Sequence, residues 1–321
     1  YTKDEKDYTY FRSNPDGTLP NGFNCFVPGQ GGVFSEPNCL LAGIYGITGR
    51  FEGDRTDWRV AADYRFTPSF LAYVSASTGF KGGGVNPRPF VVDQRLSFEP
   101  ETLTTYEAGF KSDLFDRRMR LNGAVFLNKY EDIQLSKQVC PESSLPSPCL
   151  RPDNIGAADV KGLELETSIF PGGGFSFDAS ISWLDFEYTS PVDPATGNLV
   201  NTSIPPGGIT PYTPELSYSV GAQYDHELND ATLSFRLDGA YQGDLFTNGE
   251  NTIWAEIPGR FLANARISWS KQEDWRVSLE VQNLFDEYYF QSTSDITTSL
   301  GQVTGVPGLP RTWSVSVQRN F

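Results

Sequence analysis

Few side chains in this chain could carry out chemistry. Its four cysteines form two close pairs, Cys25 with Cys39 and Cys140 with Cys149, and each pair falls in a Gly- and Pro-rich stretch. Four cysteines allow three pairings, and the two local disulfides are favoured because both pairs lie in such loops. Local loop disulfides indicate an oxidising compartment, such as the periplasm or the cell surface. Four free thiols in a cytosolic protein are the alternative.

These residues do not complete a metal or catalytic site. Neither cysteine pair has the two-residue spacing of a zinc site, and the single histidine, His226, is far from both. A nucleophile cannot be activated by a triad built around one histidine in a short turn. The run Gly82–Gly84 is not followed by the Lys-Ser/Thr of a phosphate-binding loop. We therefore expect no enzyme, no catalytic residue, no metal and no cofactor.

Aromatic and cationic residues in the predicted loops suit recognition better than catalysis. Aromatic and arginine side chains are enriched where proteins bind partners. Packing of the loop aromatics against one another is the alternative. The candidate ligand-binding residues are Phe80, Arg88, Phe90, Arg151, Phe246 and Trp254.

Charge and composition narrow the class of protein. The 321 residues carry a net charge of -15, so no nucleic-acid partner is expected, because phosphate repels an acidic chain. Aromatics make up 14%, alongside 31 Gly and 22 Pro, a mixture that favours an all-β protein. No apolar run is long enough for a transmembrane helix. Residues 1–7 lack the apolar core of a signal peptide, so either a signal was removed or the true N-terminus lies upstream.

Alternation of apolar and polar residues with a period of two is the main structural signal. In 216–224, Leu, Tyr, Val, Ala and Tyr occupy every second position, with Ser, Ser, Gly and Gln between them. The pattern recurs and predicts about twelve strands, most of them long enough to cross a membrane when tilted. The predicted strands are 1–10, 58–66, 69–79, 101–112, 117–136, 155–170, 174–188, 212–225, 230–243, 259–270, 273–284 and 311–321.

The predicted connections alternate between short and long. Short ones such as 67–68 and 271–272 alternate with long ones such as 80–100 and 285–310. Short turns on one side and long loops on the other are typical of an outer-membrane β-barrel. A soluble sandwich would distribute its loop lengths between both ends. If residue 321 ends in the periplasm, the long loops and both cysteine pairs are external.

Several segments resemble the TonB-dependent outer-membrane receptors. The segment Phe98–Lys111 is similar to their Pro-Glu…Tyr-Glu-x-Gly-x-Lys signature, and Val281–Tyr288 contains their Asn-Leu-Phe-Asp sequence. Residues 76–87 resemble their strand-to-loop segment, and residues 1–7 resemble a mid-barrel strand. The chain ends in Phe321, similar to the terminal aromatic that serves as their assembly signal, although Arg319 interrupts the apolar alternation before it.

The resemblance implies an all-β fold, a transmembrane antiparallel β-barrel with short periplasmic turns and long extracellular loops. Residues 1–321 would form one TonB-dependent receptor-like β-barrel domain. They would supply the last twelve of about twenty-two strands. The N-terminal plug, its TonB box and the first strands would then be missing from this chain. An intact twelve-stranded barrel would have the same alternation of loop lengths.

The resemblance also implies a function, namely TonB-dependent uptake of a scarce solute through the outer membrane of a Gram-negative bacterium. A ferric siderophore is the expected cargo, because it is the commonest one in the family. Vitamin B12, an oligosaccharide or a plant-derived substrate is the alternative. The absence of a Phe-Arg-Ala-Pro segment and of an external histidine argues against heme. Loop cations such as Arg88 and Arg151 would then meet an anionic ferric siderophore.

The partners follow from the same resemblance. They are the TonB–ExbB–ExbD complex, reached through the plug, the barrel-assembly machinery, and the lipid and lipopolysaccharide of the outer membrane. The alternative function is a complete twelve-stranded barrel acting as a passive channel or secretion pore. A barrel hydrolase would need a membrane-facing Ser/His pair, whereas His226 lies in a predicted short turn.

Overall fold

The chain is described by a computed structural model over residues 1–10, 25–26, 33–34, 48–86, 97–137, 151–192, 194, 197–199, 204–271, 274–297 and 301–319. For residues 25–26, 33–34, 136–137 and 151 the backbone alone is described. These parts of the chain form twenty-three β-strands. Nowhere in them is there a helix with the length and apolar character needed to cross a membrane.

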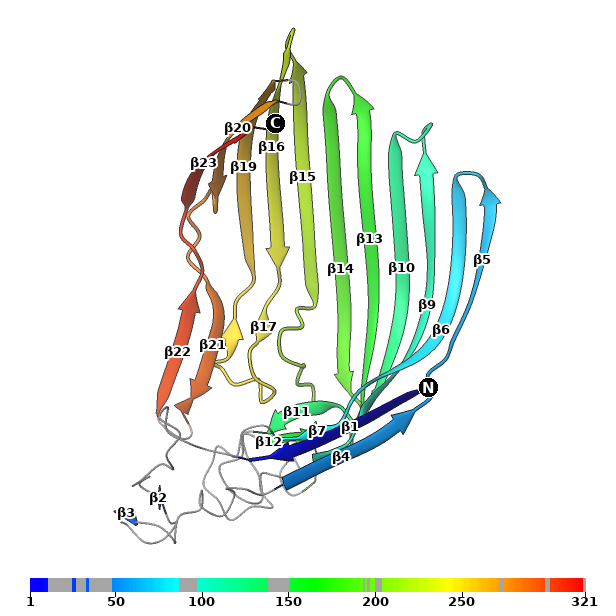
Figure 1. Ribbon diagram of the computed structural model, residues 1–321, viewed down its shortest axis with the longest axis vertical. Helices are drawn as coiled ribbons and strands as arrows, with labels where there is room; N and C mark the ends of the chain where they lie inside the picture. The colour runs from blue at the N-terminus through cyan, green and yellow to red at the C-terminus, as the bar shows by residue number, and fades with distance from the viewer. Residues whose placement is uncertain are drawn as a thin grey trace.

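Eleven strands build one antiparallel sheet (Figure 1). They are β5 (Arg59–Thr67), β6 (Phe70–Lys81), β9 (Glu101–Leu114), β10 (Met119–Glu131), β13 (Ala158–Gly172), β14 (Phe175–Tyr188), β15 (Leu216–Glu227), β16 (Ala231–Gln242), β19 (Arg260–Lys271), β20 (Trp275–Gln282) and β23 (Thr312–Arg319). Each pairs with the sheet strand that precedes or follows it along the chain, so β5 and β23 are the two outer strands. This up-and-down order confirms the antiparallel fold expected from the alternating pattern.

The other strands form six two-stranded sheets. These are β1 (Thr2–Thr9) with β4 (Thr48–Arg55), β2 (Cys25–Phe26) with β3 (Val33–Phe34), β7 (Gly84–Val85) with β8 (Ser97–Phe98), β11 (Gln134–Lys137) with β12 (Arg151–Asn154), β17 (Leu245–Phe246) with β18 (Glu256–Ile257), and β21 (Phe290–Ile296) with β22 (Gln302–Pro307). Figure 1 shows them gathered at one end of the large sheet, which we call the loop end. The short turns, such as those of β5–β6 and β13–β14, lie at the opposite end, as expected.

The strand register divides the large sheet into an apolar face and a polar face. Leu237 pairs with Ala222 and Ala265, whereas the next residue, Asp238, pairs with Asn264. The large side chains of the apolar face are exposed. They include Val60, Tyr64, Phe66, Val74, Val125, Phe177, Ile181, Val220, Phe235, Leu237, Ile267, Leu279, Val315 and Val317. A continuous exposed apolar face marks a surface that contacts a membrane or another protein.

The polar face carries ion pairs, of which the best connected lies between β14 and β16. Arg236 donates to both carboxylate oxygens of Asp178, at 2.6 and 3.0 Å, and it also pairs with Asp238 at 2.6 Å. Gly221 on the intervening strand β15 leaves the space for this contact, because a Cβ there would overlap Arg236 and Asp178. On the polar face, a position without a side chain therefore leaves room for a bidentate pair of an arginine and a carboxylate.

The prediction for residues 1–10 was wrong in one respect. A strand forms there, but β1 pairs with β4 in a separate two-stranded sheet and is no part of the large one. The reason is its sequence, since charged side chains point to both faces and no apolar face exists. Ion pairs join it to β4 instead, Lys3–Glu52 at 3.4 Å and Arg50–Glu5 at 3.7 Å.

The predicted strand 117–136 was also wrong, because it is two strands. The first, β10, ends at Glu131, and the second, β11, begins at Gln134 and pairs with β12. Between them Asp132 has a φ of 55°, in the left-handed region that breaks an extended strand. The chain therefore turns out of the large sheet at this point and enters the loop end.

Candidate ligand-binding site at the loop end

Two neighbouring segments of the loop end are fastened together by side-chain hydrogen bonds. Thr252 Oγ1, in the segment between β17 and β18, donates to Asp295 Oδ2 in β21 at 2.6 Å. The hydroxyl groups of Thr247 and Thr293 share a second hydrogen bond of 3.0 Å. These contacts join residues 245–257 to the β21–β22 hairpin as one unit.

A third segment, residues 204–213, is joined to the same unit. The side-chain amide of Asn251 bonds both backbone groups of Ile209, at 2.7 and 2.9 Å. The hydroxyl groups of Tyr212 and Ser292 share a hydrogen bond of 2.9 Å. Asn251 has a φ of 49°, which asparagine adopts more readily than most residues, so its identity suits both the turn and the bond.

The carboxylate of Asp295 is the polar centre of this unit. It accepts hydrogen bonds from Thr252 Oγ1 at 2.6 Å and from the Oγ1 and backbone N of Thr297, at 2.6 and 3.0 Å. Burial raises the pKa of this carboxyl, but the hydrogen bonds from Thr252 and Thr297 outweigh burial, and the pKa is lowered from 3.8. Asp295 is therefore ionised at neutral pH and holds its partners in that state.

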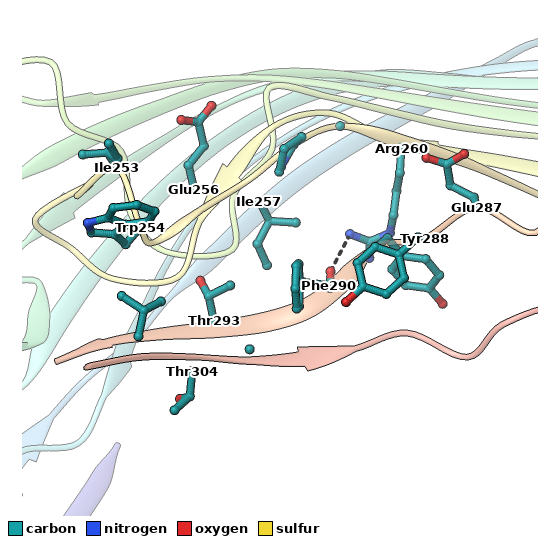
Figure 2. A pocket seen from close by; sticks show the side chains of 15 residues that line it. Ile253, Trp254, Glu256, Ile257, Arg260, Glu287, Tyr288, Phe290, Thr293 and Thr304 are labelled. Atoms are coloured by element: carbon teal, nitrogen blue, oxygen red, sulfur yellow. Dashed lines mark hydrogen bonds between the residues drawn. The ribbon is translucent and has the colours of Figure 1, made fainter. Parts of the chain in front are cut away.

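A groove of about 520 Å³ runs between residues 253–260 and the β21–β22 hairpin. Figure 2 shows Trp254 and Glu256 toward one end of this groove and Tyr288 and Glu287 toward the other. Ile257 and the ring of Phe290 lie between them. We call it the Trp254 groove; its full lining is Ile253, Trp254, Glu256, Ile257, Pro258, Gly259, Arg260, Glu287, Tyr288, Tyr289, Phe290, Thr293, Val303, Thr304 and Gly305.

The charged side chains of the Trp254 groove differ in their engagement. Arg260 lies over the ring of Tyr289, 4.6 Å from its centre, and donates to the backbone oxygen of Phe290 at 3.3 Å. Its guanidinium is therefore part of the wall. Among the side chains that the structure describes, no lysine or arginine forms an ion pair with Glu256 or Glu287. Two acidic residues against one arginine give the lining a negative formal charge.

A second cavity, of about 330 Å³, lies between β4 and the ends of β6 and β9. Its apolar surface comes from Phe51 and Phe80, and it is also lined by Arg55. Four carboxylates surround these rings, those of Asp4, Asp54, Glu99 and Asp132. Aromatic walls with acidic side chains are thus common to both hollows of the loop end.

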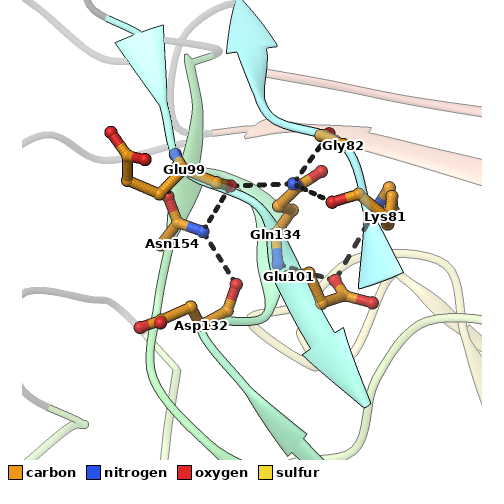
Figure 3. Close-up of polar contacts among 7 residues, drawn as sticks. All are labelled: Lys81, Gly82, Glu99, Glu101, Asp132, Gln134 and Asn154. Atoms are coloured by element: carbon orange, nitrogen blue, oxygen red, sulfur yellow. Dashed lines mark hydrogen bonds and ion pairs between the residues drawn. The ribbon is translucent and has the colours of Figure 1, made fainter. Parts of the chain in front are cut away.

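Gln134 holds the segments around the second cavity (Figure 3). Its Nε2 lies within hydrogen-bonding distance of three backbone oxygens, those of Lys81 at 3.3 Å, Gly82 at 3.1 Å and Glu99 at 2.9 Å. Its backbone N donates to Glu101 Oε2 at 2.9 Å. One buried amide therefore ties the end of β6 to the beginning of β9.

Asn154 continues the same network from β12. Its amide bonds both backbone groups of Glu99, at 2.7 and 2.9 Å, and it also donates to the backbone oxygen of Asp132 at 2.8 Å. The network places Glu99 and Asp132 where they line the second cavity. The amide of Asn154 therefore positions the backbone of Glu99 and Asp132, and the carboxylates of these two residues take no part in its hydrogen bonds.

The Asn-Leu-Phe-Asp sequence forms the turn that leads from β20 to the β21–β22 hairpin. Asn283 bonds both backbone groups of Glu287, at 2.8 Å each, and donates to the backbone oxygen of Leu309 at 3.1 Å. Asp286 accepts from the backbone N of Arg311 at 2.9 Å and pairs with its guanidinium at 3.3 Å. The motif therefore fixes the point where the chain leaves and re-enters the sheet.

The structure brings the sequence-predicted residues to different places. Trp254 lines the groove that carries its name, and Phe80 lines the second cavity. Phe80 was expected in a loop, but it lies in β6, whose pairing with β9 extends to Lys81. Phe246 lies in β17, and its backbone oxygen accepts from Tyr212 at 2.9 Å; it lines neither hollow.

Several predicted residues are not tested. Arg88, Phe90 and Phe321 lie outside the described residues, and of Arg151 only the backbone is described, in β12. The expected disulfide bonds fall in the same parts of the chain. Cys39, Cys140 and Cys149 lie outside the described residues, and of Cys25 only the backbone is described, in β2.

Sequence reasoning missed the second wall of the Trp254 groove. Tyr288, Tyr289 and Phe290 follow the Asn-Leu-Phe-Asp sequence directly, and an aromatic run at the entry to a long loop was a usable signal. Arg260 is predicted from the sequence as a strand residue, and its contact with the ring of Tyr289 is not. In the described parts of the chain, no group of three or more His, Cys, Asp or Glu residues could hold a metal ion.

Comparison with known proteins gives one family throughout. A family model described as TonB dependent receptor-like, beta-barrel matches residues 8–284. The chain is 24% identical over 253 residues to the pesticin receptor of Yersinia pestis, which covers 78% of this chain and 34% of that protein. It is 23% identical over 250 residues to the probable TonB-dependent siderophore receptor PiuA of Acinetobacter baumannii, covering 76% and 32%.

Solved structures show the same fold. The ferric yersiniabactin uptake receptor FyuA from Yersinia pestis matches with a TM-score of 0.70 and 20% identity, over 86% of this chain and 39% of that one. The closed form of the ferric-catecholate import receptor Fiu from E. coli K12 matches with a TM-score of 0.62 and 19% identity, over 93% and 40%. The chain spans about a third of the length of the curated relatives it matches.

Proposed function

Because the chain belongs to the TonB dependent receptor-like β-barrel family, we propose that it is part of an outer-membrane receptor that takes up a ferric siderophore. The family is one of receptors and transporters, and one structural neighbour is the ferripyoverdine receptor of the outer membrane of Pseudomonas aeruginosa. Support comes from relatives named as siderophore or metal receptors. The observation that carries the proposal is one sheet with an exposed apolar face, ending in aromatic-lined hollows.

Each face of the sheet has a role in this proposal. The apolar face meets lipid and lipopolysaccharide, and the polar face, with the Asp178–Arg236 pair, lines the lumen. Residues 1–321 form the C-terminal part of the barrel, and a plug with a TonB box belongs to the rest of the receptor. The chain covers 34% and 32% of the two relatives, which supports its being one part of such a receptor. TonB, energised by ExbB and ExbD, then supplies the work of uptake.

The ligand-binding residues expected from the sequence remain part of this proposal. Phe80, Arg88, Phe90, Arg151, Phe246 and Trp254 contact the cargo from outside the membrane. Trp254 and Phe80 have the strongest support, because each lines a hollow of the loop end. Cys25–Cys39 and Cys140–Cys149 disulfides stabilise external loops, and Phe321 is read by the barrel-assembly machinery.

Iron-restricted growth tests the function. The gene that encodes this chain is deleted, and growth is measured on a panel of ferric siderophores, with and without complementation. We expect at least one siderophore to support growth only in the complemented strain, and only when TonB is present. Growth support that survives loss of TonB would instead establish a passive channel. Complementation that restores growth on no iron source would overturn siderophore uptake.

A further inference from the structure

The Trp254 groove offers two aromatic faces to a ligand. The side chains of Trp254 and Tyr288 are 55% and 74% exposed, although both line the groove. Both rings are therefore accessible to a flat group, and Tyr288 also makes an edge-to-face contact with Phe290, with 5.5 Å between the ring centres. Between them, Ile257 is 2% exposed and forms a fixed apolar floor. This shape fits a flat apolar or aromatic body.

The charge of the groove selects among such bodies. Glu256 lies toward the Trp254 end and Glu287 toward the Tyr288 end, so one acidic residue of the lining stands at each end of the groove (Figure 2). The lining holds one cation, Arg260, which lies against Tyr289 and Phe290, so its two acids outnumber its cation and its formal charge is negative. A cation over an aromatic face is attracted by the ring, and a negatively charged lining strengthens that attraction. An anionic body would meet a lining of the same sign.

The loop end already holds a cation of its own in the same manner. Beside the second cavity, whose lining includes Phe51 and Asp4, the Lys6 ammonium lies 5.4 Å from the centre of the Phe51 ring, pairs with Asp4 at 2.7 Å and donates to the backbone oxygen of Gly83 at 2.7 Å. An aromatic face, a carboxylate and a carbonyl thus form a cation seat. The Trp254 groove also has aromatic rings and carboxylates in its lining, and no lysine or arginine among the described side chains pairs with those carboxylates.

Hydrogen bonds within the chain hold the walls of the groove in place. Thr252 and Asp295 fasten the β17–β18 segment to the hairpin, and Asn251 fastens that segment to residues 204–213. The walls are therefore positioned by the protein's own side chains, and preorganisation of this kind favours affinity.

We propose that the Trp254 groove binds a cationic ligand with a flat aromatic or apolar face, so that the siderophore taken up by this receptor carries a positive charge. The biological identity of the occupant rests on the proposed function. The binding chemistry does not, because it follows from Trp254, Tyr288, Glu256 and Glu287. The expected anionic ferric siderophore would have to bind elsewhere among the loops.

Fluorescence quenching by three matched pyridines tests the chemistry directly. The complete receptor in detergent micelles is titrated with 1-methylnicotinamide, which is cationic, with nicotinamide, which is neutral, and with nicotinate, which is anionic. The Trp254 contribution is obtained by subtracting the titration of Trp254→Phe. We expect saturable quenching of Trp254, tightest for 1-methylnicotinamide by about three- to tenfold over nicotinamide, and weakest for nicotinate.

Matched variants separate the groove from net charge. Glu256→Gln with Glu287→Gln should remove the preference for the cation. Asp230→Asn with Asp274→Asn neutralises two acids at the opposite end of the sheet and should leave that preference intact. Trp275→Phe, on the apolar face, should not change the saturable component. Each substitution is at the surface, and a circular dichroism spectrum of each variant checks its fold.

The outcomes are distinct. Equal or tighter binding of nicotinate at Trp254 would overturn the proposal, as would a cation preference that survives the double glutamine variant. Non-saturable quenching by all three probes would also overturn it. If the cation preference holds while siderophore-dependent growth fails, the groove stands and the proposed function falls. If growth is restored only by anionic siderophores, the function stands and the groove is not its binding site.

Discussion

The large sheet and the loop end are specified in different ways. In the sheet, backbone ladders repeat from strand to strand, and side chains need only be apolar on one face and polar on the other. At the loop end, Asn154 and Asn251 each bond both backbone groups of one residue in another part of the chain, and Asn283 bonds both backbone groups of Glu287 and the distant backbone oxygen of Leu309. One side-chain amide there makes the backbone hydrogen bonds that a neighbouring strand makes in the sheet. The sheet should therefore tolerate substitutions that keep polarity, whereas the loop end should depend on individual residues.

The largest effect should follow from reversing polarity in the sheet. Leu237 is 52% exposed at the middle of β16 on the apolar face. Leu237→Arg should destabilise the membrane-inserted receptor by about 2–4 kcal/mol, because a charge at the middle of the lipid face must leave water. Urea unfolding of receptor reconstituted in lipid vesicles measures the loss.

The same strand provides the control. Ala240 is exposed on the polar face, beside Ser219 and Leu262. Ala240→Arg introduces the same side chain and should cost much less, since that face is polar. Equal losses for the two variants would show that the apolar face does not meet lipid.

A single amide gives the next largest effect. Asn283 is 5% exposed and satisfies three backbone groups, two of Glu287 and one of Leu309. Asn283→Ala should cost about 2–4 kcal/mol, because it leaves these groups unpaired and places alanine at a φ of 51°. Urea unfolding and hydrogen exchange at the Glu287 amide measure the change.

Asn229 is a suitable comparison for that variant. It is exposed in the short turn between β15 and β16, at the opposite end of the sheet. Asn229→Ala should leave both measurements unchanged within error. If Asn283→Ala is equally silent, the loop end is not specified by its amides, and the contrast with the sheet is lost.

The sequence predicted the sheet well because its rule is local and repeated. Period-two alternation located all eleven strands of the sheet, and Leu237 and Asp238 can be assigned to opposite faces from sequence alone. The rule failed at residues 1–10, where charges alternate with charges, and at Asp132, where one left-handed residue ends a strand. A strand outside the large sheet, such as β1, has no apolar face by which the period-two rule could identify its place.

The loop end could be predicted only in part because its contacts link residues far apart in the chain. Asn251 bonds Ile209, and Gln134 lies against Lys81 and Glu99. An asparagine or glutamine that bridges two loops resembles any other loop residue in the sequence. Trp254 could be nominated as an exposed loop aromatic, but Tyr288 as its counterpart required the fold.

Acid should loosen the loop end before it affects the sheet. The folded pKa of Asp295 lies below its ordinary value of 3.8, so its hydrogen bonds contribute fully above that value and are lost as the pH falls through the folded pKa. Amide exchange at Thr297, corrected for the intrinsic pH dependence, should be about three- to tenfold faster at low pH, as expected from losing one charged hydrogen bond. The Asp295→Asn variant should show no such dependence. A wild-type acid response that persists in that variant would assign it to another group.

The smallest effect belongs to an exposed ion pair at the short-turn end. Lys271 and Asp230 lie 2.8 Å apart, and this pairing lowers the pKa of Asp230. Water screens such a pair and both side chains must be ordered to form it, so Asp230→Asn should leave urea stability within error of the wild type. Asp286→Asn is the counterpart at the loop end, where the carboxylate also accepts from the backbone of Arg311, and it should give a measurable loss. If Asp230→Asn lowers the urea stability as much as Asp286→Asn does, the short turns also depend on individual residues. The two ends of the molecule would then differ only in the length of their connections.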